Sequence, residues 1–214
     1  MGEPMKDERS DAAPEGGAAG GPEPSTMSLA RLAATGDSAA TGRLLRALAP
    51  RLHRVVRAIL GSAHPDLDDA LQQSLIGFVH ALPAFRGDCD PLGYATIIAV
   101  RTAVTTRKRA RAEHARRGDS VEADTVPAGR ISPGDEVAAQ RRKDALRELL
   151  GDLPTEQGEA LAMRVVLGWS LKEIAVYGRV PLNTVRSRLR LAKEAMRRRI
   201  EAEPQLVDML EVSA

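Results

Sequence analysis

The stretch that most constrains the fold of this chain lies near its C-terminal end, at residues 169–200. Ser170 and Glu173 have the spacing of a capping box, in which each side chain accepts a bond from the other residue's backbone N–H group. A helix is therefore predicted to begin just after Ser170. Gly178 and Pro181 keep that helix short, and a second helix is predicted to start near Pro181.

The second helix has one apolar face and a basic remainder. Apolar residues recur at helical spacing, and they are Val185, Leu189, Ala192, Met196 and Ile200. The other faces carry cations, which are Arg186, Arg188, Arg190, Lys193, Arg197, Arg198 and Arg199. A short helix, a turn and a longer basic helix predict a helix-turn-helix, whose second helix can lie in a DNA major groove. A solvated basic helix in an ordinary bundle is the alternative interpretation.

Composition favours an all-α fold. The 214 residues allow one domain or two small ones, and they include only one Trp, two Tyr and two Phe. Helix-forming residues dominate, and no segment alternates with a period of two. The single cysteine, Cys89, excludes an internal disulfide and a cysteine-cluster zinc site, as expected for the reducing cytoplasm. We predict no membrane span, no secretory signal, no metal site and no cofactor.

The charges are unevenly spread along the chain. Residues 1–27 hold two basic and six acidic residues, whereas residues 101–117 hold seven basic and one acidic. Residues 141–200 hold fourteen basic and seven acidic residues. Two basic segments behind an acidic tail indicate an anionic polymer as partner.

Helical periodicity divides the chain into a series of expected elements. Helices are predicted at residues 28–34, 38–60, 66–82, 92–111, 141–153 and 154–167, with Pro50 kinking or splitting the second. Residues 83–91 form a loop, and residues 113–140 are rich in Gly and Pro, so they are predicted to be a flexible linker. The apolar residues of the predicted helix at 141–153 are Leu146, Leu149, Leu150 and Leu153. In the next helix, the residues expected in the core are Leu161, Val165 and Val166. Trp169 is expected to anchor the helix-turn-helix.

The C-terminal stretch resembles region 4 of bacterial sigma factors of the sigma-70 family, especially the extracytoplasmic-function (ECF) group. The matching residues are Gly168, Ser170, Glu173, Ile174, Ala175, Pro181, Thr184, Val185, Ser187, Arg188 and Leu189. One departure concerns the turn, where Arg179 occupies the place of the usual glycine and Gly178 comes one residue early. An arginine held at positive φ would be strained.

The helix at residues 66–82 resembles the helix of sigma region 2 that docks on RNA polymerase. Asp69, Gln72 and Leu75 occupy the family's Asp-x-x-Gln-x-x-Phe pattern, with leucine for phenylalanine. Two further positions depart from the pattern: Gly93-Tyr94 replaces the usual Trp-Leu, and Gly158 stands where the family often has arginine. The resemblance covers residues 28–200 in all.

The resemblance implies a set of site residues. Those expected to bind a −35 promoter element are Thr184, Arg186, Ser187, Arg188, Arg190 and Lys193. Those expected to bind a −10 element, where a base is flipped out of the stack, are Phe85, Arg86, Asp88, Tyr94, Arg101, Arg107 and Lys108. For Phe85 there is an alternative of equal weight, in which its ring packs on the hydrophobic core and does not bind a base. Those expected to bind the clamp helices of the largest polymerase subunit are Asp68, Asp69, Gln72 and Gln73.

The resemblance also implies an organisation and a function. We expect a disordered tail at 1–26, a region 2 domain at 27–112, a linker at 113–140, a region 4 domain at 141–201 and a tail at 202–214, with Met1 or Met27 as the true start. The chain would be an alternative sigma factor that binds core RNA polymerase, through its clamp helices and flap, and directs initiation at specific promoters. An anti-sigma factor is a further expected partner, and the domains would be compact when free and extended on the polymerase.

Two other functions compete with this hypothesis. A stand-alone transcriptional regulator of the LuxR type carries a similar helix-turn-helix, but usually behind an α/β or ligand-sensing domain. A helical enzyme would need a catalytic motif, and the sequence contains no phosphate-binding glycine loop, HExxH motif or nucleophile elbow. We therefore expect a protein that is not an enzyme.

Overall fold

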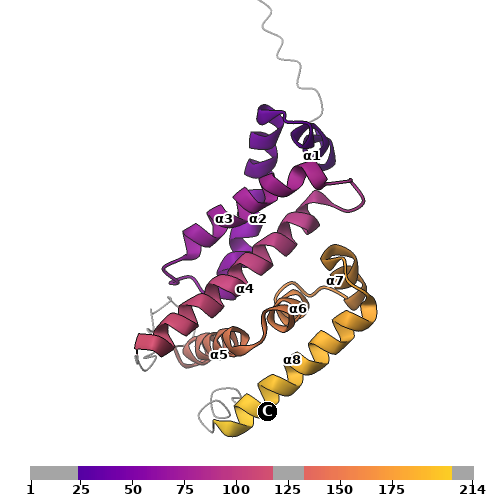
Figure 1. Ribbon diagram of the computed structural model, residues 1–214. Coiled ribbons are helices and arrows are strands. Elements are labelled where there is room, and N and C mark those ends of the chain that lie inside the picture. Colours follow the sequence, from indigo (N-terminus) through magenta and orange to yellow (C-terminus); the bar gives the residue numbers. More distant parts are fainter. Residues whose placement is uncertain (1–23, 118–132, 204–214) are drawn as a thin grey trace, which may run out of the picture.

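The computed structural model describes residues 24–117 and 133–203, and these form helices joined by short connections (Figure 1). The first half contains α1 (Thr26–Ala34), α2 (Ser38–Leu60), α3 (Leu67–Ala81), the 3₁₀ turn η1 (Leu82–Ala84) and α4 (Pro91–Arg117). The second half contains α5 (Pro133–Asp152), α6 (Thr155–Val165), α7 (Leu171–Gly178) and α8 (Leu182–Ala202). The part of the chain that is described thus contains no strand, and the predicted all-α class is confirmed.

Local signals in the sequence explain where the first helices begin and end. The Asp37 carboxylate accepts a bond of 2.9 Å from the backbone N–H of Ala40 and so caps α2. Gly61 ends α2 at a φ of 102°, which glycine adopts without a steric penalty. Of the two predicted effects of Pro50, a kink or a split, the split is wrong, because α2 runs through that residue as one helix. A proline interior to a helix removes one backbone hydrogen bond, and the buried apolar face of α2 continues on both sides of it.

Helix α4 lies between the two halves of the molecule (Figure 1). It packs on α2 and α3 on one side and on α5, α6 and α7 on the other. Ile98 lies against α3, since a Cβ atom at Gly77 would be 3.2 Å from it, and Val104 lies against α6, since a Cβ atom at Gly158 would be 3.3 Å from it. The two halves therefore share a hydrophobic core that runs through α4.

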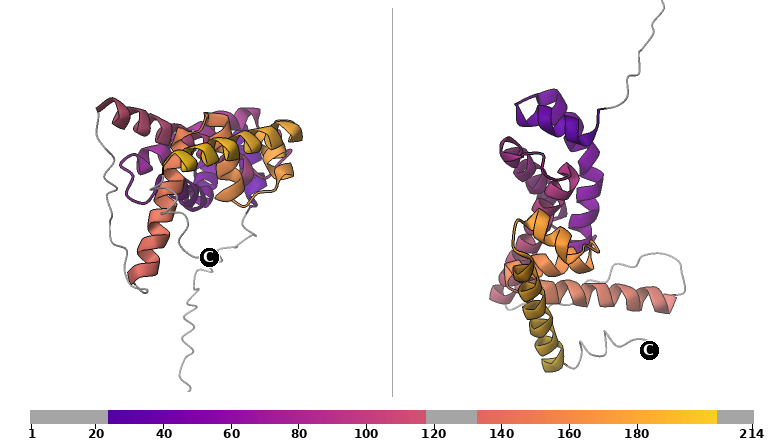
Figure 2. Two further views of the ribbon diagram at one scale, coloured as in Figure 1. Left: turned by 90° about the horizontal axis from the view of Figure 1, so that it is seen from below. Right: turned by 90° about the vertical axis from the view of Figure 1, so that its right-hand side faces the viewer.

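Several predicted boundaries and core positions differ from the structure. α4 extends to Arg117 and α5 begins at Pro133, so helices enter the predicted linker from both ends. The N-terminal part of α5 projects from the rest of the molecule (Figure 2). Val165 is 63% exposed, so the prediction that it lies in the core is wrong, and Leu146 is also exposed, at 38%. Ala145 takes the buried position on α5, because it faces Met196 and Ile200 of α8. Most of the predicted tails (residues 1–23 of 1–26, and residues 204–214 of 202–214) and the linker residues 118–132 lie outside the described residues.

Candidate nucleic-acid interface

The predicted helix-turn-helix is formed by α7, the turn at residues 179–181 and α8. Both bonds of the capping box are present: the backbone N–H of Glu173 donates to the Ser170 hydroxyl at 3.2 Å, and the N–H of Ser170 donates to the Glu173 carboxylate at 2.7 Å. On α8, Val185, Leu189 and Ala192 are buried. This apolar stripe turns the basic faces of α8 outward.

The residues expected to bind a −35 element fall into two groups. Arg186, Ser187, Arg190 and Lys193 are exposed, and Thr184 is half-buried. Arg188 turns inward, because its guanidinium lies 2.7 Å from the Glu156 carboxylate of α6 and its side chain is only 22% exposed. In this arrangement Arg188, which was expected to bind the −35 element, is paired with Glu156 instead.

Exposed cations gather in one hollow beside α8. Arg164 of α6 and Leu171 of α7 line a hollow of about 410 Å³ together with Arg186, Leu189, Arg190 and Lys193. Arg164 also donates a bond of 2.8 Å to the carbonyl of Trp169, which orders the entry into α7. Arg164 was not predicted from the sequence, because it lies on the preceding helix and only the packing of α6 on α8 brings it beside the basic face.

Two aromatic rings, Phe85 of the loop at residues 85–90 and Tyr94 of α4, lie in contact. The rings of Phe85 and Tyr94 lie 5.6 Å apart between centroids, and Tyr94 meets Phe78 edge-on at 6.3 Å. Phe85 packs on the core and also stacks on Tyr94, so the core position of this ring is observed. Arg86 and Asp88 are exposed at the surface of the loop.

The basic strip of α4 faces the second half of the chain rather than solvent alone. Arg101 pairs with Glu159 at 3.5 Å, and the Lys108 ammonium donates to the Thr155 hydroxyl at 3.1 Å. Arg107 donates to the carbonyls of Arg147 and Leu60. Burial lowers the pKa of Arg107 to about 10, so the guanidinium still carries its charge at neutral pH.

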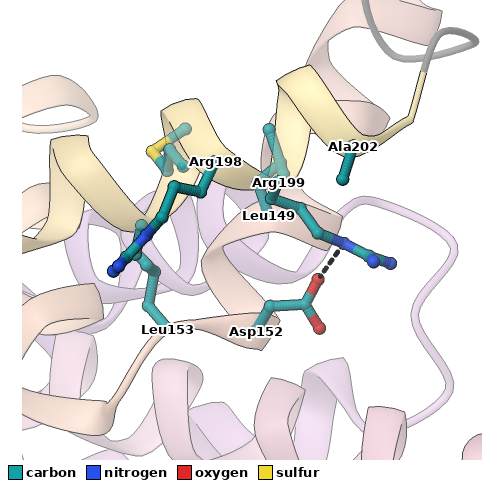
Figure 3. Close-up of a pocket in the computed structure, with 8 residues that line it drawn as sticks. Leu149, Asp152, Leu153, Arg198, Arg199 and Ala202 are labelled. Carbon is teal, nitrogen blue, oxygen red and sulfur yellow. Dashed lines mark ion pairs between the residues drawn. The ribbon is translucent and has the colours of Figure 1, made fainter.

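The same strip continues to Arg111, which forms a two-bond pair with Asp152, the second bond being 2.9 Å. Asp152 also pairs with Arg199 of α8 at 3.5 Å, beside a hollow of about 380 Å³ between α5 and α8 (Figure 3). Asp152 and Glu159 were not selected from the sequence, since single acidic residues on helices give no signal of their cross-helix partners.

The residues expected to bind polymerase share one exposed face of α3. Asp68, Asp69, Gln72 and Gln73 are all exposed, and Gln73 donates a bond of 2.7 Å to Asp69. The apolar Ile76, which is 46% exposed, extends the face by one turn. Leu75, which takes the place of the family's phenylalanine, instead packs partly buried against the core.

A contact between α4 and α7 joins the two halves near the aromatic loop. A Cβ atom at Gly93 would lie 2.5 Å from Cζ of Tyr177, so the tyrosine ring lies directly on the glycine backbone. The Arg179 guanidinium lies 5.6 Å from the centroid of the Tyr94 ring. The Tyr177 ring also packs on the Trp169 ring, with 4.9 Å between centroids, in agreement with the predicted anchoring role of that tryptophan.

Two kinds of site are not found among residues 24–117 and 133–203. No three His, Cys, Asp or Glu side chains gather there as metal ligands would. No helix in those ranges is long and apolar enough to cross a membrane. Cys89 is half-buried, and burial raises the pKa of its thiol, which disfavours a reactive thiolate.

Comparisons with known proteins agree for both halves of the chain. Residues 44–113 match the family model described as Sigma-70 region 2, and residues 143–196 match the model described as Sigma-70, region 4. The ECF RNA polymerase sigma-E factor of Escherichia coli is 28% identical over 145 residues, which cover 64% of this chain and 74% of the relative. The probable RNA polymerase sigma-C factor of Mycobacterium bovis is 28% identical over 188 residues, which cover 82% of this chain and 90% of the relative.

Two solved structures also resemble the chain. CnrH in complex with the cytosolic domain of CnrY aligns at a TM-score of 0.48 and 23% identity, covering 83% of this chain and 98% of that one. The sigma factor RpoE in complex with the anti-sigma factor NepR from Bartonella quintana aligns at a TM-score of 0.49 and 21% identity. The alignment covers 81% of this chain and 98% of that one.

The order of the two matches decides between the competing hypotheses. A LuxR-type regulator is not favoured, because the half of the chain before the helix-turn-helix matches sigma region 2. The two family models together span more than half of the chain, in the order and spacing that the sequence analysis expects. This chain therefore belongs to the extracytoplasmic-function group of the sigma-70 family.

Proposed function

We propose that this alternative sigma factor divides its work among three surfaces: α3 for polymerase, α8 for the −35 element, and the loop before α4 with α4 itself for the −10 element. As a member of its group, the chain binds core RNA polymerase and directs initiation at specific promoters. In this proposal it needs no catalytic residue or cofactor, acts in the cytoplasm, and is held inactive by an anti-sigma factor until it is required.

One observation carries the −35 assignment. Arg164, Arg186, Arg190 and Lys193 line a single surface hollow at the N-terminal half of α8, with the apolar floor supplied by Leu171 and Leu189. A cluster of cations at the start of a helix-turn-helix recognition helix suits the edges and phosphates of a major groove. We propose that Arg186 and Ser187 reach base edges, while Arg190, Lys193 and Arg164 contact phosphates.

The −10 assignment rests on the aromatic pair and its neighbours. Tyr94 and Phe85 offer a stacking surface, and Arg86 and Asp88 offer polar groups in the exposed loop next to it. Stacking and hydrogen bonds of this kind can offset the few kcal/mol that flipping a base costs. The strip of α4 that includes Arg101, Arg107 and Lys108 would contact the phosphates beside that base.

The proposal also assigns the two structural units. We take residues 27–112 as the region 2 domain and residues 141–201 as the region 4 domain. In transcription the two read elements that lie apart on the promoter, so they must be able to separate at residues 113–140.

The α8 assignment is tested by transcription from a promoter of this sigma factor with purified core polymerase. Arg186→Ala and Arg190→Ala should each reduce transcript yield, since the first loses a base contact worth about 1–3 kcal/mol and the second loses a phosphate contact. Arg197→Ala is the matched control, because Arg197 lies on the same helix but pairs only with Glu201 at 2.6 Å among the described residues. Full activity of both test variants would show that α8 is not the recognition helix.

The α3 assignment is tested by capture of core polymerase on the immobilised protein. Asp69→Arg and Gln72→Ala should reduce capture while leaving the helical fold intact, since both side chains are exposed. Glu113→Arg, an equal charge reversal at an exposed position of α4, should capture polymerase as the unaltered protein does. If the α3 variants capture polymerase normally, the docking surface lies elsewhere.

A further inference from the structure

The start of α8 carries two polar side chains that bind each other. The Nη1 group of Arg186 donates a hydrogen bond of 3.0 Å to Oδ1 of Asn183, which lies one helical turn before it. Both side chains are exposed. An exposed bond of this kind replaces bonds to water, so its net contribution to folding is small. Asn183 is also not among the residues predicted to bind the −35 element, so the pair suggests a further role on this face.

The pair lies where a recognition helix meets the bases. Asn183 and Arg186 belong to the first turns of α8, which begins at Leu182. In a helix-turn-helix, the N-terminal residues of the second helix contact base edges. Side chains three positions apart on a helix lie about 5–6 Å apart between Cβ atoms, and neighbouring base pairs are stacked about 3.4 Å apart. The two side chains can therefore reach neighbouring base pairs.

The bond to Asn183 also decides where the guanidinium points. Arg186 borders the hollow that it shares with Arg164, Arg190 and Lys193, which suits phosphate groups. Asn183 holds the guanidinium toward the N-terminal end of α8, whereas Lys193 lies about two turns in the other direction. Without this bond, the long arginine side chain could turn to a phosphate, which carries no sequence information. Asn183 thus favours a base contact by Arg186 over a phosphate contact.

The hydrogen-bonding groups of the pair indicate which bases it suits. Because Oδ1 of Asn183 faces the guanidinium, its amide N–H groups point elsewhere, and no group in the described part of the chain accepts from them. Ser187 cannot supply the same donor, since its hydroxyl donates to the carbonyl of Thr184 at 3.0 Å. The pair therefore presents donors to a groove. Guanine offers two acceptors there, N7 and O6, whereas adenine offers one acceptor and one donor.

We propose that Asn183 is a specificity-determining residue of the −35 contact. Its Oδ1 atom positions Arg186 on a guanine, and its amide N–H groups donate to an acceptor on the neighbouring base pair. The −35 element would then contain two neighbouring base pairs that present acceptors to α8, with guanine under Arg186. This inference rests on the proposed function, because it takes α8 to be the recognition helix.

The test is transcription by the full chain and purified core polymerase from a pool of promoter fragments. The fragments keep one −10 element and carry a randomised −35 element, and sequencing of the transcripts gives the base preference at each position. The position read by Arg186 is the one whose preference is lost in Arg186→Ala. We expect guanine there, preferred about tenfold by the unaltered protein. Asn183→Ala should lower that preference to about threefold although Arg186 is still present, because the guanidinium is no longer held in place.

Asn183→Asp separates positioning from base reading. The carboxylate still accepts from Arg186 but cannot donate, so the guanine preference should be kept. At the neighbouring base pair, the preference should switch by about tenfold toward a base with an amino group, since carboxylates accept from cytosine N4. An aspartate in the first turn of a helix is favoured by the helix dipole, so this variant should fold. A merely structural role of Asn183 would not produce such a switch.

The controls separate this inference from the proposed function. Arg197→Ala, further along α8 at a residue paired with Glu201, should keep every base preference. Unchanged preferences in both Asn183 variants, or an equal loss of transcripts from every −35 sequence, would overturn the inference. If Arg186→Ala still changes the preference in that case, the −35 assignment of α8 stands. Unchanged preferences in Arg186→Ala as well would contradict the assignment of α8 itself, and the role of Asn183 with it.

Discussion

Arg179 shows at the scale of one residue how this chain departs from its family. It ends α7 with φ 52° and ψ 43°, and it is the one non-glycine residue at positive φ in the described part of the chain. The left-handed conformation costs a residue with a Cβ atom about 1–2 kcal/mol. The guanidinium over the Tyr94 ring offsets part of that cost. The strain expected from the sequence is therefore present, whereas its aromatic partner could not be predicted, because Tyr94 is distant in the sequence.

Two substitutions at this position separate the backbone from the side chain. Arg179→Ala keeps the strain and loses the contact with Tyr94, while Arg179→Gly loses the contact and relieves the strain. We expect the glycine variant to be more stable than the alanine variant by about 1 kcal/mol. Chemical denaturation of both variants measures this difference. Equal stability, or a more stable alanine variant, would mean that residue 179 is not left-handed in solution.

His64, which follows the end of α2, is expected to make the stability of the fold depend on pH. Burial lowers the pKa of the imidazole, Asp66 opposes that shift, and Arg107 and His114 add to it. The Nδ1 atom accepts a bond of 3.2 Å from the backbone N–H of Asp66, which only an unprotonated Nδ1 can do. Below about pH 6.5, the unfolded chain takes up a proton that the folded chain resists. Stability should therefore fall as pH falls, and the loss should level off below the folded pKa.

The measurement compares the unfolding free energy of the unaltered protein with that of His64→Gln. The advantage of the unaltered protein should shrink between about pH 7.5 and about pH 5.5. His80→Gln, which removes an exposed imidazole from α3, should keep the pH dependence of the unaltered protein. A difference between unaltered protein and His64→Gln that does not change with pH would contradict the burial of this side chain.

At the scale of the element, local signals were predictable and packing partners were not. The capping box at Ser170, the cap at Asp37 and the stripe of α8 depend on residues within a few positions of one another, and all three are present. Helix α4 is different, because it is buried on two sides and its apolar residues therefore follow no single face. Its cations could be predicted to form a strip, but the sequence held no signal that the strip would meet α5 and α6.

The contact of α4 with α7 can be tested by adding a single methyl group. Gly93→Ala should favour helix by about 1 kcal/mol, but its Cβ atom would collide with the Tyr177 ring, so we expect a net loss of about 1–3 kcal/mol. Gly42→Ala on α2 is the matched control, because no atom lies within 4 Å of its added Cβ. That variant should gain about 0.5–1 kcal/mol. Thermal or chemical denaturation measures both. A gain at both positions would mean that α7 does not rest on Gly93.

At the scale of the whole molecule, the family and its all-α fold followed from the order of the motifs, whereas the arrangement of the halves did not. Residues 44–113 and 143–196 match the two sigma regions, and the sequence predicted both. The shared core through α4 depends on Gly93 and Gly158, small residues that give no periodic signal but permit close approach of helices. The surfaces assigned to polymerase, the −10 element and the −35 element remain proposals that rest on exposed faces and clustered charge.

The most direct test of the central claim is run-off transcription with purified core RNA polymerase on a pool of genomic fragments, with and without this protein. We expect discrete transcripts that depend on the protein, with a shared pair of sequence elements upstream of their start sites. Binding of the protein alone to specific duplexes, with no new transcripts from the polymerase, would contradict the assignment as a sigma factor and favour a stand-alone regulator.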